Sequence, residues 1–198
     1  DTLTIHSGTV TISTSYEGIE ASTITIEGGV LDITSSDDGI NVAGGVDDNT
    51  GDTRQPSAFG GDRFGSSSNN WLYIHGGTIT VDATGDGLDA NGNIQMTGGE
   101  VFIHGTTGQG DGAIDFDGRF SLDGGTLVAV GSRAMFQSPS DSSQQPSATI
   151  FLSQQYPTGS VLTLQDSIGE ELVSFTSKKT FSAVTFSSKD LAVGQEYT

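Results

Sequence analysis

The sequence predicts an all-β protein: a right-handed parallel β-helix with an antiparallel β cap at its C-terminal end. Three observations predict this fold. One strand–bend–strand pattern recurs five times along the chain, and a Gly-Gly or Ser-Gly pair marks the same point of every copy. Glycine supplies 29 of the 198 residues without a collagen period, which is typical of a chain with many tight turns.

Each copy alternates apolar and polar residues on both sides of its glycine pair, which predicts two short strands joined by a bend. Copies stacked about 4.8 Å apart bury their apolar side chains in columns, which a single copy cannot do. The predicted columns are Leu3, Ile24, Leu72, Ile94 and Phe120; Ile5, Ile26, Ile74, Met96 and Leu122; and Val10, Leu31, Ile79, Val101 and Leu127. A β-sandwich is the alternative, but its hairpins would not place the glycine pair at one point of every copy.

The repeats divide the chain into two parts. We expect the β-helix to span residues 1–137, with an insertion loop at 43–70 that is rich in Gly, Ser, Asp and Asn. Residues 138–198 are expected to form a polar linker and a β unit. This unit would cover the last, open sheet edge, because such edges invite aggregation. Its expected antiparallel strands are 148–152, 161–164, 172–175 and 183–186.

The formal net charge of −18 limits the partners that the chain can take. Nucleic acid and anionic membranes would be repelled. The chain has no run of roughly 18 apolar residues, so no membrane-spanning segment is predicted. The chain has no cysteine, so it has neither a disulfide nor a thiolate metal site. Together with the many Ser, Thr, Asn and Gly residues, this favours a bacterial extracellular protein, secreted or attached to the cell surface. We expect it to be a monomer.

A second motif follows the strand pairs and places acidic residues on either side of an aliphatic one. Stacking brings these carboxylates into columns about 5 Å apart, where like charges repel each other. Calcium relieves such repulsion, because it takes six to eight oxygen ligands at about 2.3–2.6 Å. The predicted calcium ligands are Glu17, Glu20, Asp37, Asp38 and Asn41 around one ion, and Asp86, Asp89, Asp111, Asp115 and Asp117 around another. The alternative is a set of solvated turns in which Asp serves only the turn geometry.

The same motifs carry a resemblance to a known family. They read EGIE at 17–20, DDGIN at 37–41, GDGLDANG at 85–92 and AIDFDG at 113–118. In these motifs the chain resembles the bacterial family of calcium-bound, right-handed β-helical carbohydrate-binding domains found on clostridial and related cell surfaces. That family is similar in fold to family-nine pectate lyases. The resemblance implies calcium-dependent, non-catalytic binding of plant cell-wall glycans such as cellulose or polygalacturonate.

An enzyme that cleaves acidic polysaccharide is the alternative function. β-Elimination of a uronate needs calcium and a base, which in the lyases is Lys or Arg. The lysines Lys178, Lys179 and Lys189 all lie in the C-terminal unit, so none is expected at a base position on the repeats. We therefore expect no catalytic residue, and we expect His75 and His104 to be exposed and inert. A purely structural surface adhesin would show the same repeat and the same calcium ligands.

The outward faces of the predicted coils offer a surface for an extended glycan. Trp71, Tyr73 and Phe102 are the candidate carbohydrate-binding residues, because aromatic rings stack on sugar rings while nearby hydroxyls and amides bind sugar hydroxyls. Each ring alone can equally be packing under the 43–70 loop. The outward rows that contain two of them are Thr4, Thr25, Tyr73, Gln95 and Ser121, and Thr11, Asp32, Thr80 and Phe102. An acidic glycan is expected to dock through bound calcium, because the protein's own charge opposes it.

Overall fold

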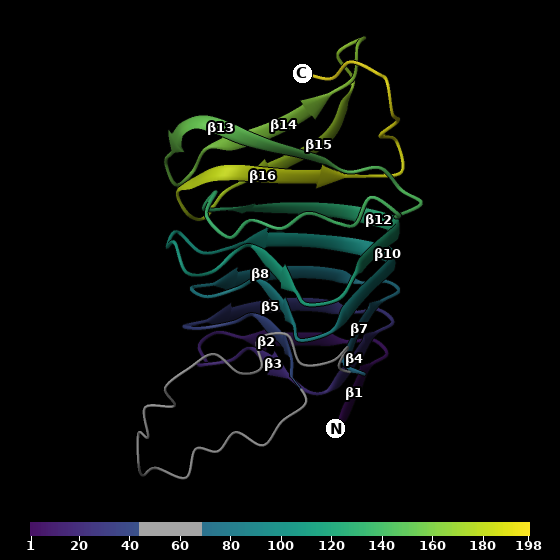
Figure 1. The fold of residues 1–198 in the computed structure, drawn as a ribbon, viewed down its shortest axis with the longest axis vertical. Helices are drawn as coiled ribbons and strands as arrows, with labels where there is room; N and C mark the ends of the chain where they lie inside the picture. The colour runs from purple at the N-terminus through teal and green to yellow at the C-terminus, as the bar shows by residue number, and fades with distance from the viewer. Residues whose placement is uncertain (44–68) are drawn as a thin grey trace, which may run out of the picture.

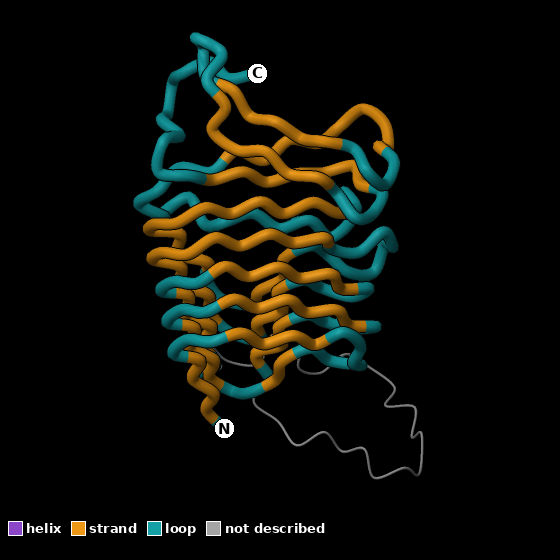
Figure 2. Tube along the Cα trace, turned by 180° about the vertical axis from the view of Figure 1, so that it is seen from behind, coloured by secondary structure: helices purple, strands orange, loops and turns teal. Residues whose placement is uncertain are grey.

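The computed structural model describes residues 1–43 and 69–198, and in these ranges it contains strands and no helix. The protein is all-β, as predicted. Its strands form three sheets with ten, four and two members. The largest sheet is mixed, because parallel pairs join its first strands and antiparallel pairs join its last ones. Figures 1 and 2 show the strands stacked along the long axis, with the two termini at opposite ends.

Three parallel ladders make up the stacked part of the chain. The first joins β1 (Thr2–Ile5), β4 (Thr23–Ile26), β7 (Trp71–Ile74), β10 (Asn93–His104) and β12 (Phe120–Gly131). The second joins β2 (Thr9–Ile12), β5 (Val30–Ser35) and β8 (Thr78–Ala83) to the second halves of β10 and β12. The third joins β3 (Ile19–Glu20), β6 (Ile40–Val42), β9 (Leu88–Ala90) and β11 (Ile114–Phe116). We call one step along these ladders a level. Level one consists of β1, β2 and β3, level two of β4, β5 and β6, and level three of β7, β8 and β9. Level four consists of β10 and β11, and level five of β12.

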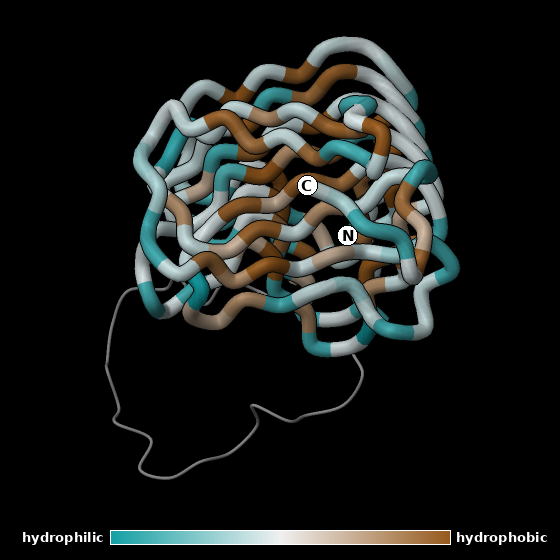
Figure 3. Tube along the Cα trace, turned by 90° about the horizontal axis from the view of Figure 1, so that it is seen from above, coloured by the Kyte–Doolittle hydropathy of each residue, from teal (hydrophilic) through white to brown (hydrophobic). Residues whose placement is uncertain are grey.

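The register of the ladders confirms the predicted columns of apolar side chains. Ile24 pairs with Leu3 on one side and with Leu72 on the other, and the columns through Ile26 and Leu31 continue in the same way. All column members of levels two to five are at most 1% exposed, and they belong to one apolar cluster. Figure 3 looks along the stack and shows hydrophobic residues alternating with hydrophilic ones on the strands.

The second glycine of each pair has a left-handed backbone conformation, which explains why the pair recurs. Gly77 has a φ of +92°, and a Cβ added to it would lie 2.9 Å from Gly29 O one level away. Only glycine tolerates both the positive φ and this close approach of the neighbouring backbone. In levels one to three the pair separates two strands, as predicted, whereas β10 and β12 each continue through it. The prediction of two short strands is thus wrong for the last two copies, because pairing between β10 and β12 resumes at Glu100, directly after the glycines.

The C-terminal part supplies four more strands: β13 (Ala148–Tyr156), β14 (Val161–Gln165), β15 (Glu171–Thr176) and β16 (Phe181–Ser187). They include the four predicted strands, and each is somewhat longer than predicted. β16 pairs antiparallel with β12, and β13 pairs antiparallel with β16, so both extend the ten-stranded sheet beyond level five (Figure 1). β14 and β15 form the separate two-stranded antiparallel sheet.

The C-terminal unit also lies against the outer face of the stack. A second apolar cluster joins Val128 and Val130 of β12 to Phe175 of β15 and Phe186 of β16. Phe102 of level four packs against this cluster, with its ring centroid 6.0 Å from that of Phe175. The unit therefore covers a side of levels four and five as well as the end of the stack.

The predicted insertion at 43–70 falls almost wholly outside the described residues, which include only Ala43, Asn69 and Asn70 of it. The predicted domain boundary at 137/138 falls in the segment between the end of β12 and the start of β13. None of the described residues belongs to a helix that could cross a bilayer.

Candidate functional site

The third ladder places four of the predicted metal ligands in one row, one from each of its strands. We call these residues the acidic row: Glu20, Asn41, Asp89 and Asp115. The residue before each of them is aliphatic and buried, so the alternation of the strand turns the row outward. Because parallel strands lie about 4.8 Å apart, the row brings the carboxylates of Asp89 and Asp115 close together, whereas the neutral Asn41 separates Asp89 from Glu20.

A second set of carboxylates lies on the turn before each of these strands. Backbone hydrogen bonds between successive turns put Glu17, Asp38 and Asp86 in equivalent positions, and we call them the turn acids. The backbone N–H of Asp86 donates to Asp38 Oδ1 across 2.7 Å, and that of Gly112 donates to Asp86 Oδ1 across 2.5 Å. The level-two turn is thus tied to the level-three turn, and the level-three turn to the level-four turn, through a carboxylate.

Burial and mutual repulsion raise the pKa of four of these groups. Burial, together with the carboxylates of Asp38 and Asp37, raises the pKa of Glu17 to about 7. Burial and the charge of Asp38 raise the pKa of Asp86 to about 7, although a backbone hydrogen bond lowers it. The same two causes raise the pKa of Asp89 to about 8, and burial raises the pKa of Asp38 above its usual range. A nearby cation would favour the ionised form of all four groups.

Two buried oxygen atoms at this place, Glu17 Oε2 and Asn41 Oδ1, have no hydrogen-bond partner. A buried acceptor left without a partner costs about 1–3 kcal/mol, so such atoms favour a further ligand at the site. Calcium takes carboxylate and amide oxygens, so the donor set fits this ion. As placed, the side chains do not converge. Within residues 1–43 and 69–198, no three His, Asp or Glu side chains lie together in a group that could hold a metal ion.

The other predicted ligands lie at the margins of this region. Asp37 precedes Asp38 on the level-two turn, and its charge contributes to the raised pKa of Glu17. Asp111 stands on the level-four turn, where one extra residue puts Gly112 in the place of a turn acid. Asp117 follows β11 and is exposed. The acidic residues form one continuous stack, because the level-two turn hydrogen-bonds directly to the level-three turn.

Two of the predicted carbohydrate-binding residues lie together on the outer face of the first ladder. The rings of Trp71 and Tyr73 are parallel to within 2°, with centroids 5.1 Å apart, and His75 continues the series at 6.0 Å from Tyr73. We call these three residues the aromatic ladder. The Tyr73 ring lies between the other two rings, so Trp71 and His75 are the two ends of the aromatic ladder. Polar side chains lie in register on the neighbouring strands: Thr23, Thr25, Asn93 and Gln95.

The structure does not bring Phe102 together with the aromatic ladder, because Phe102 lies on the other outward face and packs against Phe175. His104 lies beside it and is 3% exposed, so the expectation of an exposed side chain is wrong. Its ring stacks on Phe175 at 4.6 Å, and its Nδ1 accepts a hydrogen bond from the Lys178 backbone across 3.1 Å. Burial and then the charge of Lys178 lower the pKa of His104 to about 4. His75 is exposed, as expected.

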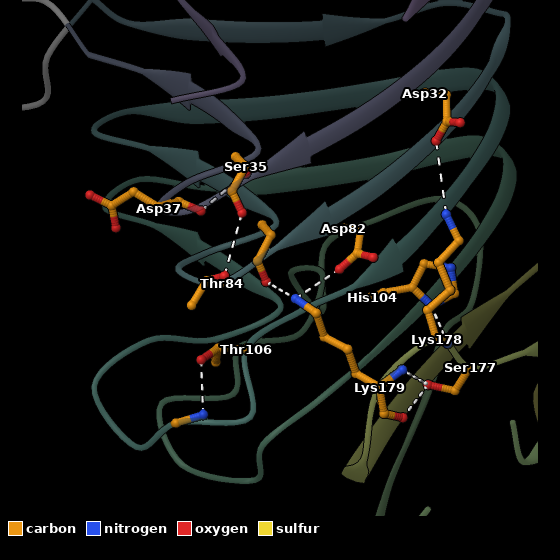
Figure 4. A network of polar contacts seen from close by, with 12 residues as sticks. Asp32, Ser35, Asp37, Asp82, Thr84, His104, Thr106, Ser177, Lys178 and Lys179 are labelled. Carbon is orange, nitrogen blue, oxygen red and sulfur yellow. Dashed lines mark hydrogen bonds and ion pairs between the residues drawn. The ribbon is translucent and has the colours of Figure 1, made fainter. Parts of the chain in front are cut away.

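Two lysines of the C-terminal unit reach the stack, which the sequence analysis did not predict. Lys179 Nζ lies 2.9 Å from Asp82 Oδ1 and also donates to the backbone carbonyl of Ala83 (Figure 4). Lys178 Nζ lies 3.9 Å from Asp32 Oδ1. Both lysines belong to the C-terminal unit, as expected, but the loop between β15 and β16 carries them back onto β5 and β8.

An all-β stack that carries aromatic rings among hydroxyl and amide side chains has the features of a carbohydrate-binding module. Residues 1–151 match the model of a family described as "Carbohydrate-binding domain-containing protein". This match covers more than half of the chain, so the chain belongs to that family, and membership indicates carbohydrate binding. The comparison with curated proteins gives no match, and the comparison with solved structures gives none either.

Proposed function

We propose that the chain is a non-catalytic, calcium-dependent binding domain for polysaccharides of the plant cell wall, such as cellulose or polygalacturonate, and that it acts outside the bacterial cell. The observation that carries this proposal is the match of residues 1–151 to a carbohydrate-binding domain family. The aromatic ladder supports it independently, since half-buried Trp and Tyr side chains on a polar face suit a ligand that has both apolar and polar sides.

The proposed scaffold is a right-handed parallel β-helix over residues 1–137, apart from the insertion at 43–70. Its support is the return of the chain to the same three parallel ladders in levels one to four, and to the first two of them in level five. Crossover connections between parallel strands of one sheet are right-handed in nearly all proteins, which favours this handedness. Such a scaffold offers flat faces with side chains in rows, along which an extended glycan can lie.

The proposed glycan surface is the outer face of the first ladder. Trp71 stands at the end of the aromatic ladder, where Tyr73 flanks it on one side. The apolar side of a sugar ring can therefore pack on the indole, while the amides of Asn93 and Gln95 lie one level away to bind its hydroxyls. Phe102 has no part in this surface, because Phe175 covers it.

The proposed metal is calcium, held by the acidic row and the turn acids. The unpaired oxygens of Glu17 and Asn41 support this, as does the raised pKa of the buried carboxyls around them. The carboxylates would gather around the ion by rotation of their own side chains. Bound calcium would supply positive charge and open coordination positions for the oxygens of a glycan. Without a cation, the net charge of −18 would repel an acidic polysaccharide.

Retention on a panel of polysaccharides tests this proposal. The chain would be incubated with cellulose, polygalacturonate and a neutral galactan, each with added calcium and with a chelator. We expect retention on at least one of them, with loss in chelator and recovery when calcium is restored. Retention on none of them, with a folded protein, would contradict the proposal. Release of unsaturated sugar in the same incubations would contradict the non-catalytic assignment in favour of the alternative enzyme.

A further inference from the structure

The loop between β15 and β16 carries Lys179 to the end of β8, directly beside the acidic turn of level three. The Lys179 ammonium group is held by the carboxylate of Asp82 and by the carbonyl of Ala83, the last residue of β8. The two charged side chains are only 20% and 22% exposed. Such shielding from water strengthens the attraction within an ion pair, whereas fully exposed pairs contribute little to stability.

Beyond Ala83, hydrogen bonds lead from Thr84 through Ser35 to Asp37 on the level-two turn (Figure 4). Thr84 follows Ala83 and donates to Ser35 O from both its backbone N–H and its hydroxyl, at 3.3 and 3.4 Å. Ser35 Oγ donates to Asp37 O across 3.1 Å, and Gly85 N donates to the same oxygen across 3.0 Å. The next residue is Asp86, the turn acid whose backbone N–H donates to Asp38 Oδ1 on level two. Lys179 therefore stands at the start of an unbroken series of contacts that ends at the carboxylates.

This part of the turn has little room for adjustment. Gly85 is buried, and a Cβ added to it would collide with the carboxylates of Asp38 and Asp37. A small displacement of Ala83 would therefore move the turn against these side chains. Close-packed interiors transmit such displacements instead of absorbing them.

We propose that Lys179 is a positioning residue for the acidic turns. By holding the Ala83 carbonyl it fixes the turn at 84–87 and thus the position of the Asp86 carboxylate. The inference rests on the proposed calcium site, to which it adds a residue from outside the repeats. It also gives the C-terminal unit a role in ligand binding besides covering the stack.

The sign of the effect separates positioning from simple electrostatics. Lys179 is a cation close to an acidic site, so its charge opposes the binding of another cation. If only charge mattered, Lys179→Met would tighten calcium binding. If Lys179 positions the turn, the same change weakens binding, because the ligands are no longer held in place.

Lys178 offers a matched control in the same loop. Its partner is Asp32 at 3.9 Å, both side chains are about half exposed at 47% and 55%, and the pair lies outside the series that leads to the turn. Lys178→Met removes the same charge from nearly the same place. Lys179→Arg keeps the charge and the donors, so we expect it to retain most of the wild-type calcium affinity.

Two measurements on the full chain test the proposal: calorimetric titration with calcium alone, and amide hydrogen exchange at residues 84–88 in calcium-free protein. For Lys179→Met we expect about tenfold weaker calcium binding, as for other residues that orient metal ligands, together with faster exchange at 84–88. For Lys178→Met we expect equal or slightly tighter binding and unchanged exchange. Where Lys179→Met fails to fold, Asp82→Asn breaks the same pair from the other side and replaces it in the hydrogen-exchange measurement, since the loss of a negative charge weakens calcium binding by itself.

The outcomes separate this inference from the proposed function. A wild-type chain that binds no calcium overturns the metal site, and with it the calcium arm of the inference. A wild-type chain that binds calcium, with Lys179→Met binding as well or better and exchanging at the wild-type rate, overturns the role of Lys179 alone. Equal weakening by both lysine variants also overturns it, because general attachment of the β15–β16 loop to the stack would then explain the result.

Discussion

The carboxylate of Asp38 accepts a hydrogen bond from the backbone N–H of Asp86 across 2.7 Å, from one level of the stack to the next. Asp86 in turn accepts a hydrogen bond from Gly112 of level four. One oxygen of each carboxylate thus holds the following turn in register. The acidic turns therefore contribute to the stacking of the chain as well as to the candidate metal site, and changes to them should affect both properties.

Calcium is expected to raise the melting temperature of the chain. One ion at 100 times its dissociation constant stabilises a protein by about 2.7 kcal/mol, or about 5–10 °C for a chain of this size. Asp89→Asn should remove much of this shift. In chelator near pH 8 the variant should melt at or above the wild-type temperature. The pKa of Asp89 is raised to about 8, so its ionisation as the pH rises from about 4 to 8 destabilises the calcium-free fold.

Asp141→Asn is the control for this experiment, because Asp141 is exposed in the segment between β12 and β13, away from the acidic row. It should show the full calcium shift in scanning calorimetry. Equal shifts for wild type and Asp89→Asn would show that the acidic row does not hold the ion.

Trp71→Ala is expected to weaken retention on the preferred polysaccharide by about tenfold, which corresponds to about 1.4 kcal/mol. The loss follows from removal of the ring at the end of the aromatic ladder. Trp71→Phe should recover part of the affinity, because it restores an aromatic face. Affinity electrophoresis would measure the effect, with Tyr156→Ala on the C-terminal unit as the control. Equal retention of Trp71→Ala and wild type would place the glycan on another face.

The contribution of His104 to the stability of the chain is expected to fall as the pH drops from about 6.5 to about 4, opposite in sign to the contribution of the carboxyls with a raised pKa. Burial and Lys178 lower its pKa to about 4 in the folded chain, whereas an unfolded histidine titrates near 6.5. The unfolded chain therefore binds the extra proton first, so the contribution of His104 is complete above pH 6.5 and is lost toward pH 4. His104→Gln keeps an acceptor for Lys178 N–H without titrating, so its melting temperature should rise relative to that of the wild type as the pH drops over this range. If the melting temperatures of the two proteins changed equally with pH, His104 would not be the group responsible.

Gly77→Ala is expected to destabilise the chain more than Gly159→Ala. Both glycines have a positive φ, +92° and +84°, so both changes introduce backbone strain of about 1–3 kcal/mol. Only at Gly77 does the added Cβ meet backbone of the neighbouring level, 2.9 Å from Gly29 O, whereas nothing lies within 4 Å of it at Gly159. Urea denaturation should therefore separate the two variants by about 1–3 kcal/mol, the usual effect of overpacking. Equal losses would mean that the levels can move apart at little cost.

The apolar columns could be predicted because the glycine pair fixes the alignment of the copies independently of their composition. Once Gly29 is aligned with Gly77, the period of two determines which side chains point inward. The continuity of β10 and β12 through their glycine pairs could not be predicted. It depends on pairing with the neighbouring level, which overrides the local preference for a bend.

The covered face of the stack was harder to predict, because Phe102 and Phe175 are far apart in the sequence. One signal was present: the outward row changes from polar Thr11, Asp32 and Thr80 to apolar Phe102, and Val128 continues it. An apolar residue in an outward row indicates a partner from elsewhere in the chain. The contact between Lys179 and Ala83 left no such signal, since a lysine at a loop tip is ordinary.

Level one pairs with a neighbour on one side only among the described strands, and its Leu3, Ile5 and Val10 are half-buried where their level-two counterparts are fully buried. The opposite end is held by β16 and by the second apolar cluster. Since each level contacts only its neighbours, opening should begin at β1 and β2 and advance toward β12. The chain thus has a built-in direction of unfolding, and amide protection is expected to increase steadily from its first strand to its twelfth.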